Sequence, residues 1–280
     1  MKRVLSIMAW LAFGVVAVNA QISVITDDDF LQRDTCDIIK YVVNYDMEFV
    51  DDISKTPYEY KKDRMLLQIG ERATLFYSYD KYLADSTNLE VLKRNGTEYV
   101  GSNGASWLLY KNYPKEKHYS YLDKIIRDRY VCHEPVEEPD WQLVADTTAI
   151  IKEHPCVLAT ADYLGRKWYA WYAEDIPLSE GPWKLCGLPG LVLRAYDSEN
   201  QYRFELSGIR NGRPGEVITY IGNKHETIDR KTLNQIYKRY FSDPVGFIVN
   251  SDPNVKVTVT DDKGNKLDKM PGIPYNPIER

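Results

Sequence analysis

The side chains most able to carry out covalent or metal chemistry in this sequence are four histidines and four cysteines. The histidines are His118, His133, His154 and His225. A zinc site usually combines cysteines two to four residues apart with nearby histidines. Here the closest approaches are Cys132-His133 and His154-Pro155-Cys156, and neither has that spacing. We therefore expect no metal and no cofactor, and we interpret each histidine as a surface or turn residue.

The even number of cysteines is typical of disulfides when a chain reaches an oxidising compartment. The cysteines are Cys36, Cys132, Cys156 and Cys186, which permit three pairings. We predict Cys156 with Cys186 and Cys36 with Cys132, because the first pair encloses one continuous motif region rich in glycine and proline. A bridge that closes a loop of about 30 residues would add about 3.5 kcal/mol to the free energy of unfolding.

No catalytic motif stands out in the sequence, which lacks a G-x-S-x-G elbow, an H-E-x-x-H helix, a P-loop and a dinucleotide fingerprint. Carboxylates are plentiful, but Asp27-Asp28-Asp29 and Asp51-Asp52 lie in polar stretches, where solvation is the simplest interpretation. Carboxylates from distant strands can still meet in a fold without leaving a motif. A secreted or periplasmic hydrolase that uses such carboxylates is therefore the alternative to a non-enzymatic role.

The segment from Asp175 to Leu193 is unusual because its glycines and prolines alternate with large apolar residues. Glycine permits positive φ or close backbone approach, and proline fixes φ. The pattern therefore predicts an ordered crossover that leads into a strand beginning at Leu191. Its structural residues are predicted to be Gly181, Pro182, Gly187, Pro189 and Gly190.

Aromatic side chains are abundant, with 22 tyrosines and 6 tryptophans. Such amphipathic rings suit contact surfaces. The alternation over residues 168–172 is explained most simply by side chains that cover both faces of a sheet. If the chain has a ligand or partner surface, its candidates are Trp168, Trp171, Trp183 and Leu188.

Strand-like runs must build most of the scaffold for these residues. They cover 36–50, 65–69, 73–79, 107–113, 141–143, 155–163, 167–172, 191–196 and 202–206, with another near Tyr130. Helices are predicted over 80–93, ended by Asn95-Gly96, and over 227–241, capped by Thr227 or Asp229. Because short strands follow one another with turns between them, we expect an α+β fold: a mostly antiparallel, curved β-sheet with two or more flanking helices.

The N-terminus has the pattern of a secretory signal peptide. Lys2 and Arg3 precede an uncharged run that ends in small residues up to Ala20. That run of about 15 residues is shorter than the roughly 20 that a spanning helix needs. We expect cleavage after Ala20, a single domain over residues 21–280, and no transmembrane segment after cleavage. The tail from Lys263 contains three prolines and is expected to run extended.

The charge of the chain argues against one class of partner. Without Lys2 and Arg3, 34 of the 36 basic residues remain, against 41 acidic ones. Proteins that bind nucleic acid neutralise its phosphates with lysine and arginine, which releases the condensed counterions into solution. An acidic chain is poorly suited to this, so we expect no nucleic-acid partner.

The stretch Gly187-Leu188-Pro189-Gly190-Leu191-Val192 resembles the motif that gives the GLPGLI family its name, with valine in place of the last isoleucine. Other stretches similar to that family are 155–159, 165–172, 176–177, 181–184 and 275–279. The resemblance is dense over 141–209 and looser elsewhere. It implies an exported protein of Gram-negative bacteria that is associated with the cell envelope, with outer-membrane transport as one setting, and it carries over no catalytic or binding residue.

Export, aromatic content and the lack of catalytic motifs together favour a non-enzymatic protein that is periplasmic or associated with the outer envelope. We expect it to bind an apolar ligand or another envelope protein.

Overall fold

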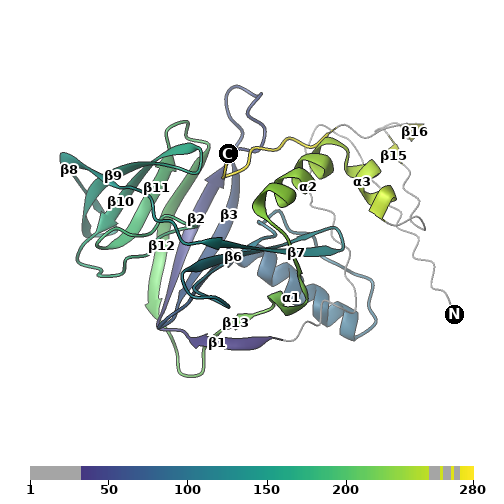
Figure 1. Ribbon diagram of the computed structural model, residues 1–280, viewed down its shortest axis with the longest axis horizontal. Coiled ribbons are helices and arrows are strands. Elements are labelled where there is room, and N and C mark those ends of the chain that lie inside the picture. The colour runs from purple at the N-terminus through teal and green to yellow at the C-terminus, as the bar shows by residue number, and fades with distance from the viewer. Residues whose placement is uncertain (1–32, 252–258, 261–265, 268–271) are drawn as a thin grey trace.

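The computed structural model describes residues 33–251, 259–260, 266–267 and 272–280. The predicted signal peptide over residues 1–20 lies outside the described residues. Most of the regular structure in the described part is β-strand, accompanied by three α-helices (Figure 1).

Twelve strands form one open sheet in the order β14-β7-β6-β5-β4-β3-β2-β12-β11-β10-β9-β8. Their bounds are β2 Tyr41–Phe49, β3 Lys61–Ile69, β4 Thr74–Ser78, β5 Leu108–Lys111, β6 His118–Ile125, β7 Asp128–Pro135, β8 Gln142–Ile151, β9 His154–Tyr163, β10 Arg166–Ala173, β11 Leu191–Asp197, β12 Tyr202–Asn211 and β14 Glu226–Thr227. Neighbours are antiparallel except β14 and β7, which run parallel. The sheet thus consists of two antiparallel meanders, β2 to β7 and β8 to β12. Pairing between β2 and β12 joins them.

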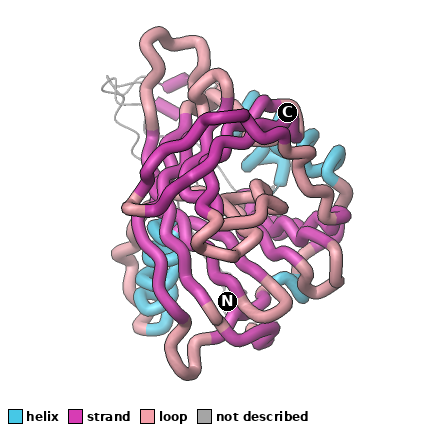
Figure 2. Tube along the Cα trace, turned by 90° about the vertical axis from the view of Figure 1, so that its left-hand side faces the viewer, coloured by secondary structure: helices cyan, strands magenta, loops and turns pink. Residues whose placement is uncertain are grey.

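Short strand pairs and helices complete the described part. These elements are β1 Asp34–Ile38 with β13 Val217–Tyr220, β15 Val259–Thr260 with β16 Lys266–Leu267, the 3-10 turn Gly222–Lys224, and the helices α1 Tyr79–Lys93, α2 Arg230–Ser242 and α3 Pro244–Ser251. Figure 2 shows that the helices lie on different sides of the strands, so the predicted sheet with flanking helices is confirmed in outline.

Capping side chains fix the starts of the two longer helices. The Ser78 hydroxyl accepts a hydrogen bond from the Lys81 backbone N–H at 3.0 Å where α1 begins. The Asp229 carboxylate accepts one from the Thr232 N–H at 2.6 Å where α2 begins. Both satisfy backbone donors that the helix itself leaves free. Of the two predicted caps of the second helix, Asp229 is therefore the one used.

The sheet buries apolar side chains on both of its faces. The larger cluster combines residues of both meanders with the buried side of α2, including Tyr45, Phe76, Trp168, Phe204 and Tyr240. A smaller cluster around Tyr110 and Leu122 is covered by the β1–β13 pair. Strand alternation explains the division, because successive side chains of one strand point to opposite faces.

Several predicted boundaries are wrong. The run over 36–50 is two strands, since β1 leaves the sheet to pair with β13 and only β2 pairs with β3. The predicted short strand 141–143 is the beginning of β8, which continues to Ile151. Strand β6 and helix α3 were not predicted. The hairpin of β3 and β4 is confirmed, with Met65 opposite Ser78 and Ile69 opposite Thr74.

Candidate functional site

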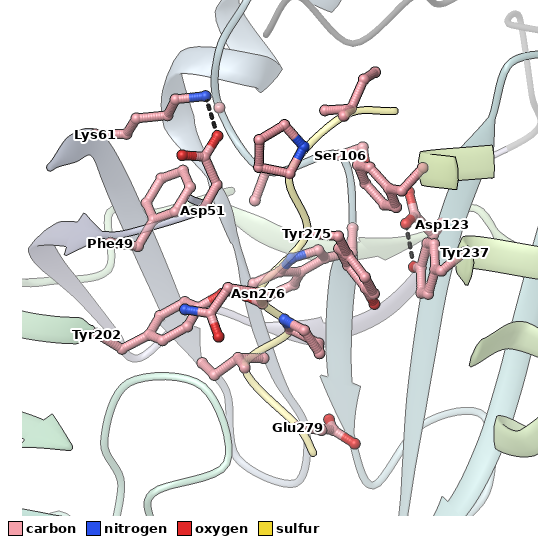
Figure 3. A pocket seen from close by; sticks show the side chains of 18 of the residues that line it. Phe49, Asp51, Lys61, Ser106, Asp123, Tyr202, Tyr237, Tyr275, Asn276 and Glu279 are labelled. Carbon is pink, nitrogen blue, oxygen red and sulfur yellow. Dashed lines mark hydrogen bonds and ion pairs between the residues drawn. The ribbon is translucent and has the colours of Figure 1, made fainter. Parts of the chain in front are cut away.

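A pocket of about 200 Å³ lies where strands β2 and β6, helix α2 and the C-terminal segment 272–280 meet (Figure 3). Its lining is mostly apolar, with a few polar groups. The residues are Met47, Phe49, Asp51, Lys61, 102–107, Tyr121, Asp123, Tyr202, Arg230, Asn234, Tyr237, Tyr240, Phe241 and 273–279. A concave, largely apolar site with a few polar groups is what a small-molecule site usually looks like.

Aromatic rings form the walls of the pocket in contacting groups. Phe49 stacks on Tyr202 with ring centroids 6.2 Å apart, and Trp107 stacks on Tyr121 at 5.8 Å. On the helix side, Tyr275 of the C-terminal segment stacks on Phe241 at 4.3 Å. Rings that are fixed by neighbours offer a ligand a large apolar surface at little cost in side-chain entropy.

One carboxylate lies deep in this pocket at the end of a chain of hydroxyl groups. The Tyr237 hydroxyl donates to Asp123 (Figure 3). The Tyr121 and Tyr237 hydroxyl oxygens are 3.2 Å apart. Strand alternation places Tyr121 and Asp123 on the same face of β6, toward α2. Asp123 also accepts from the Lys124 backbone N–H at 2.7 Å and from the Ser106 side chain.

Burial raises the pKa of Asp123, although the hydrogen bonds from Ser106, Tyr237 and Lys124 oppose this rise. The charged carboxylate loses hydration in the protein interior, and these hydrogen bonds replace part of it. The pocket lining thus contains a buried carboxylate that binds a proton more readily than one in water.

The other acidic groups of the lining have basic partners. Asp51 lies 2.5 Å from the Lys61 ammonium. Glu279 lies 2.8 Å from the Lys184 ammonium, and 3.6 Å separate it from the Arg230 guanidinium. In the view of Figure 3, the Asp51–Lys61 pair and Asp123 lie on either side of the C-terminal segment.

The buried Arg166 side chain fixes the C-terminal segment that lines one side of the pocket. Its guanidinium bonds Asp197 at 2.6 Å, Asn276 at 2.9 Å and the carbonyl oxygens of Pro277 and Ile278 at 2.6 and 3.0 Å. This arrangement uses the planar fork of donors that arginine has and lysine lacks. The first residue of β10 thereby positions the segment that carries Tyr275.

A network of alternating acidic and basic side chains also holds the C-terminal segment in place. The Lys184 ammonium lies 3.1 Å from Glu134 of β7 and 2.8 Å from Glu279. Arg230 at the start of α2 hydrogen-bonds Glu134 and lies over the Tyr121 ring, 4.3 Å from its centroid. Burial disfavours the charged form of Glu134, but the Arg230 hydrogen bonds and the Lys184 charge outweigh it and lower the pKa of Glu134 to about 2.

The four residues suggested by the sequence as a ligand or partner surface do not line this pocket. Trp168, Trp183 and Leu188 are buried in the larger core cluster, where the Trp168 and Trp183 ring centroids are 5.5 Å apart. Trp171 is half-buried beside the same cluster. The structure therefore places three of them in the core of the sheet.

The Gly/Pro-rich crossover is closely packed. A Cβ atom on Gly190 would lie 2.1 Å from the Ala173 carbonyl oxygen, and one on Gly181 would lie 2.1 Å from that of Leu185. Gly187 has φ +93°, which side-chain-bearing residues rarely adopt. Pro182 is buried between these glycines, whereas Pro189 is exposed. Close backbone approach and positive φ thus account for glycine at these positions.

Neither predicted disulfide is present, and all four cysteines are free thiols. Cys36 packs against the smaller cluster and Cys132 lies in the larger one, so the sheet separates them. The Cys186 sulfur lies 3.4 Å from the Tyr119 hydroxyl, and the Cys156 thiol donates to the His154 carbonyl at 3.5 Å. The prediction was wrong because two cysteines that enclose a motif in sequence need not meet in the fold.

Sequence reasoning missed Asp123 and the aromatic walls. The run Tyr119-Ser120-Tyr121-Leu122-Asp123 alternates in a way that predicts a strand with a carboxylate beside two tyrosines. It was not recognised because β6 itself was not predicted. The C-terminal stretch 275–279 was noted only as part of the family resemblance.

None of the helices in the described ranges is both long and apolar enough to cross a membrane.

Comparison with known proteins gives one sequence match. Residues 141–194, which run from the start of β8 into β11, match a family described as "Protein of unknown function (Porph_ging)". No curated protein matches the chain.

Among solved structures, two crystal forms of PNGF-II each share 13% identity with this chain at a TM-score of 0.46, covering 70% of it and 32% of the PNGF-II chain. The Pseudomonas aeruginosa MucA/MucB complex shares 9% identity at a TM-score of 0.30, covering 68% of this chain and 55% of the other. The chain thus spans about a third of the length of the PNGF-II chains. The segment over residues 141–194 is similar to a family of unknown function.

Proposed function

We propose that this protein is an exported cell-envelope protein that binds a small, largely apolar ligand in the pocket beneath its C-terminal segment, without catalysing a reaction. The observation that supports this most directly is the pocket of about 200 Å³ with walls of aromatic rings. For comparison, an apolar cavity of about 150 Å³ is large enough to bind benzene. The pocket therefore has room for one small ring system.

Export and family are part of the proposal and rest on the sequence. The signal-like N-terminus supports export to the periplasm or outer envelope. The motif over 187–192 supports membership of the GLPGLI family, and it lies inside the segment over 141–194 that matches the family of unknown function. In this family the crossover would serve as architecture, and the pocket would serve ligand binding.

A hydrolase is the second candidate, because Asp123 lies in the pocket and its pKa is raised by burial. Such a reaction needs a second group beside the first, commonly another carboxylate. The other acidic side chains of the lining, Asp51 and Glu279, are each held by basic side chains. This pairing favours binding over carboxylate catalysis.

The proposal is tested with tert-butylbenzene as a neutral probe, added to the mature chain over residues 21–280. The readout is the NMR resonance of the Trp107 indole N–H, assigned with Trp107→Phe. We expect a saturable shift in the wild-type protein. Ala105→Trp should abolish it, because Ala105 lines the pocket and a large side chain there would fill the space.

The matched control is Ala145→Trp, which adds the same side chain at an exposed position of β8 and should bind like wild type. Melting temperatures of both variants verify that each is folded. Two results would overturn the proposal. One is an unchanged shift in folded Ala105→Trp, and the other is no shift in the wild type with either tert-butylbenzene or phenyltrimethylammonium, a cation of the same shape.

A further inference from the structure

We propose that the pocket selects an organic cation, an ammonium group attached to a small apolar body, with Asp123 as its counter-ion. This inference rests on the proposed ligand-binding function and specifies the chemical class of the ligand. It follows from three features of the pocket: the balance of charges, the direction of the hydrogen bonds and the aromatic walls.

The charges of the lining leave one carboxylate without a basic partner. Lys61 neutralises Asp51, while Lys184 and Arg230 lie beside Glu279. Among the described residues, no lysine, arginine or histidine forms an ion pair with Asp123. Lys81 acts on Asp123 through its charge without an ion pair between them. A cation that enters the pocket therefore finds a carboxylate with which no basic side chain of the described residues is paired.

The hydrogen bonds around Asp123 call for a donor. Tyr237 gives its hydroxyl hydrogen to Asp123, so the Tyr121 hydroxyl must donate to the Tyr237 oxygen across their 3.2 Å separation. Ser106 and the Lys124 N–H also donate to the carboxylate. An ionised carboxylate has about four acceptor sites, and these three donors leave one of them for a ligand N–H or a cationic charge.

Aromatic faces provide the rest of a site for cations. The ring faces of this pocket already accept cations from the protein: Arg230 lies over Tyr121 at 4.3 Å and Arg166 over Tyr202 at 4.7 Å. Electron-rich rings attract an ammonium group electrostatically, most strongly where water is excluded. Trp107 and Tyr275 bring two further rings to the lining.

The free-energy cost of removing a cation from water is offset only if the cation lies beside an opposite charge. Besides the hydrogen bonds from Ser106 and the Lys124 N–H, the titratable groups that act on Asp123 are Tyr121 on its own strand, Tyr237 on α2, Tyr275 on the C-terminal segment and Lys81 on α1. Burial raises the pKa of Asp123 in the empty pocket, and a bound ammonium group would lower it. Cation binding should therefore release a proton and strengthen as pH rises through that pKa.

The test compares phenyltrimethylammonium with tert-butylbenzene, which has the same shape without the charge. Both are titrated into the mature chain with the Trp107 indole N–H as readout. We expect phenyltrimethylammonium to bind at least about tenfold more tightly, as expected for a cation desolvated among aromatic rings. Calorimetry in two buffers of different ionisation enthalpy should detect a proton released on binding near the pKa of Asp123.

Asp123→Asn should remove both the preference and the proton release. Asp162→Asn is the matched control, since it removes the same charge from an exposed position of β9. If both probes bind equally and no proton is released, the cation proposal is wrong while the pocket remains a binding site. If neither binds, the pocket proposal fails as well. Because the comparison and the proton count use the wild-type protein, they decide the matter even if Asp123→Asn does not fold.

Discussion

The Glu279 carboxylate, next to the C-terminal residue, lies 2.8 Å from the ammonium group of Lys184 in the Gly/Pro-rich crossover. The Lys184 side chain is 3% exposed, so water screens this ion pair little. The Gly/Pro-rich crossover and the C-terminal segment therefore meet in space. Their contact anchors the C-terminal segment that lines the pocket.

Removing the charge of Lys184 should be costly, because Glu134 and Glu279 would lose a buried partner that they share. We expect Lys184→Met to lower the free energy of unfolding by about 3 kcal/mol, as is typical when one member of a buried ion pair is removed. Lys167→Met, at an exposed position of β10, is the control and should change it by less than about 0.5 kcal/mol. Urea unfolding measures both, and equal losses would show that the buried position of Lys184 is irrelevant.

Acid should weaken the same group of charges. The pKa of Glu134 is lowered to about 2 in the folded protein, where burial is outweighed by Arg230 and Lys184, against an ordinary value of 4.5. Its ionised form therefore stabilises the fold fully above about pH 4.5, and this contribution is lost as pH falls from there toward 2. In urea unfolding from pH 7 to pH 3, the difference in stability between wild type and Glu134→Gln should shrink in that window. A constant difference would contradict the role of the charge.

The meander over residues 155–206 could be predicted because each strand is short, alternating and bounded by a turn. Helix α2 could be predicted from its apolar face and its cap at Asp229. Local patterns of this kind fix local structure. They carry no information on partners far along the chain, such as β2 with β12, and so could not show that β1 leaves the sheet.

The pocket could not be predicted for the same reason. Asp123, Tyr237 and Tyr275 come from a strand, a helix and a tail, and only the tertiary fold brings them together. As a large aromatic residue, Trp168 is a candidate for a contact surface by its type, yet it is fully buried between sheet and crossover. Residue type shows that a ring will be buried somewhere, but not whether a protein side chain or a ligand covers it.

The glycines of the crossover should resist even the smallest substitution. A Cβ atom at Gly190 would meet the Ala173 carbonyl oxygen at 2.1 Å, and one at Gly187 would require a rare positive φ. We expect Gly190→Ala and Gly187→Ala each to lower the free energy of unfolding by about 1–3 kcal/mol. Gly101→Ala has no atom within 4 Å of the new Cβ and should be neutral or slightly stabilising. Unchanged melting temperatures in the two crossover variants would show that the backbone there is not constrained.

Export predicts a defined mature chain. When the full sequence is expressed in a Gram-negative host, the protein should accumulate outside the cytoplasm with Gln21 as its first residue, because cleavage is expected after Ala20. Ala20→Arg should block processing, since a signal peptidase requires a small residue at this position. Intact mass of the fractionated protein measures this. A full-length mass in the wild type would refute the predicted cleavage.

Replacing Arg166 with lysine should open the pocket while leaving a positive charge in place. Arg166 holds Asn276 and the carbonyl oxygens of Pro277 and Ile278 with donors from one planar group, and a lysine ammonium cannot reach all three. We expect faster amide hydrogen exchange over residues 273–279 and at least a tenfold loss of tert-butylbenzene affinity. Arg203→Lys changes an arginine that stacks on Tyr60 outside the pocket and should alter neither quantity.

If Arg166→Lys loses affinity for tert-butylbenzene without faster exchange over 273–279, Arg166 does not act through the C-terminal segment. If amide exchange over 273–279 becomes faster but the affinity for tert-butylbenzene is unchanged, the C-terminal segment lies beside the pocket without contributing to binding. Faster exchange and weaker binding together in Arg166→Lys, with neither change in Arg203→Lys, would show that one buried arginine on β10 maintains the binding pocket through the C-terminal segment.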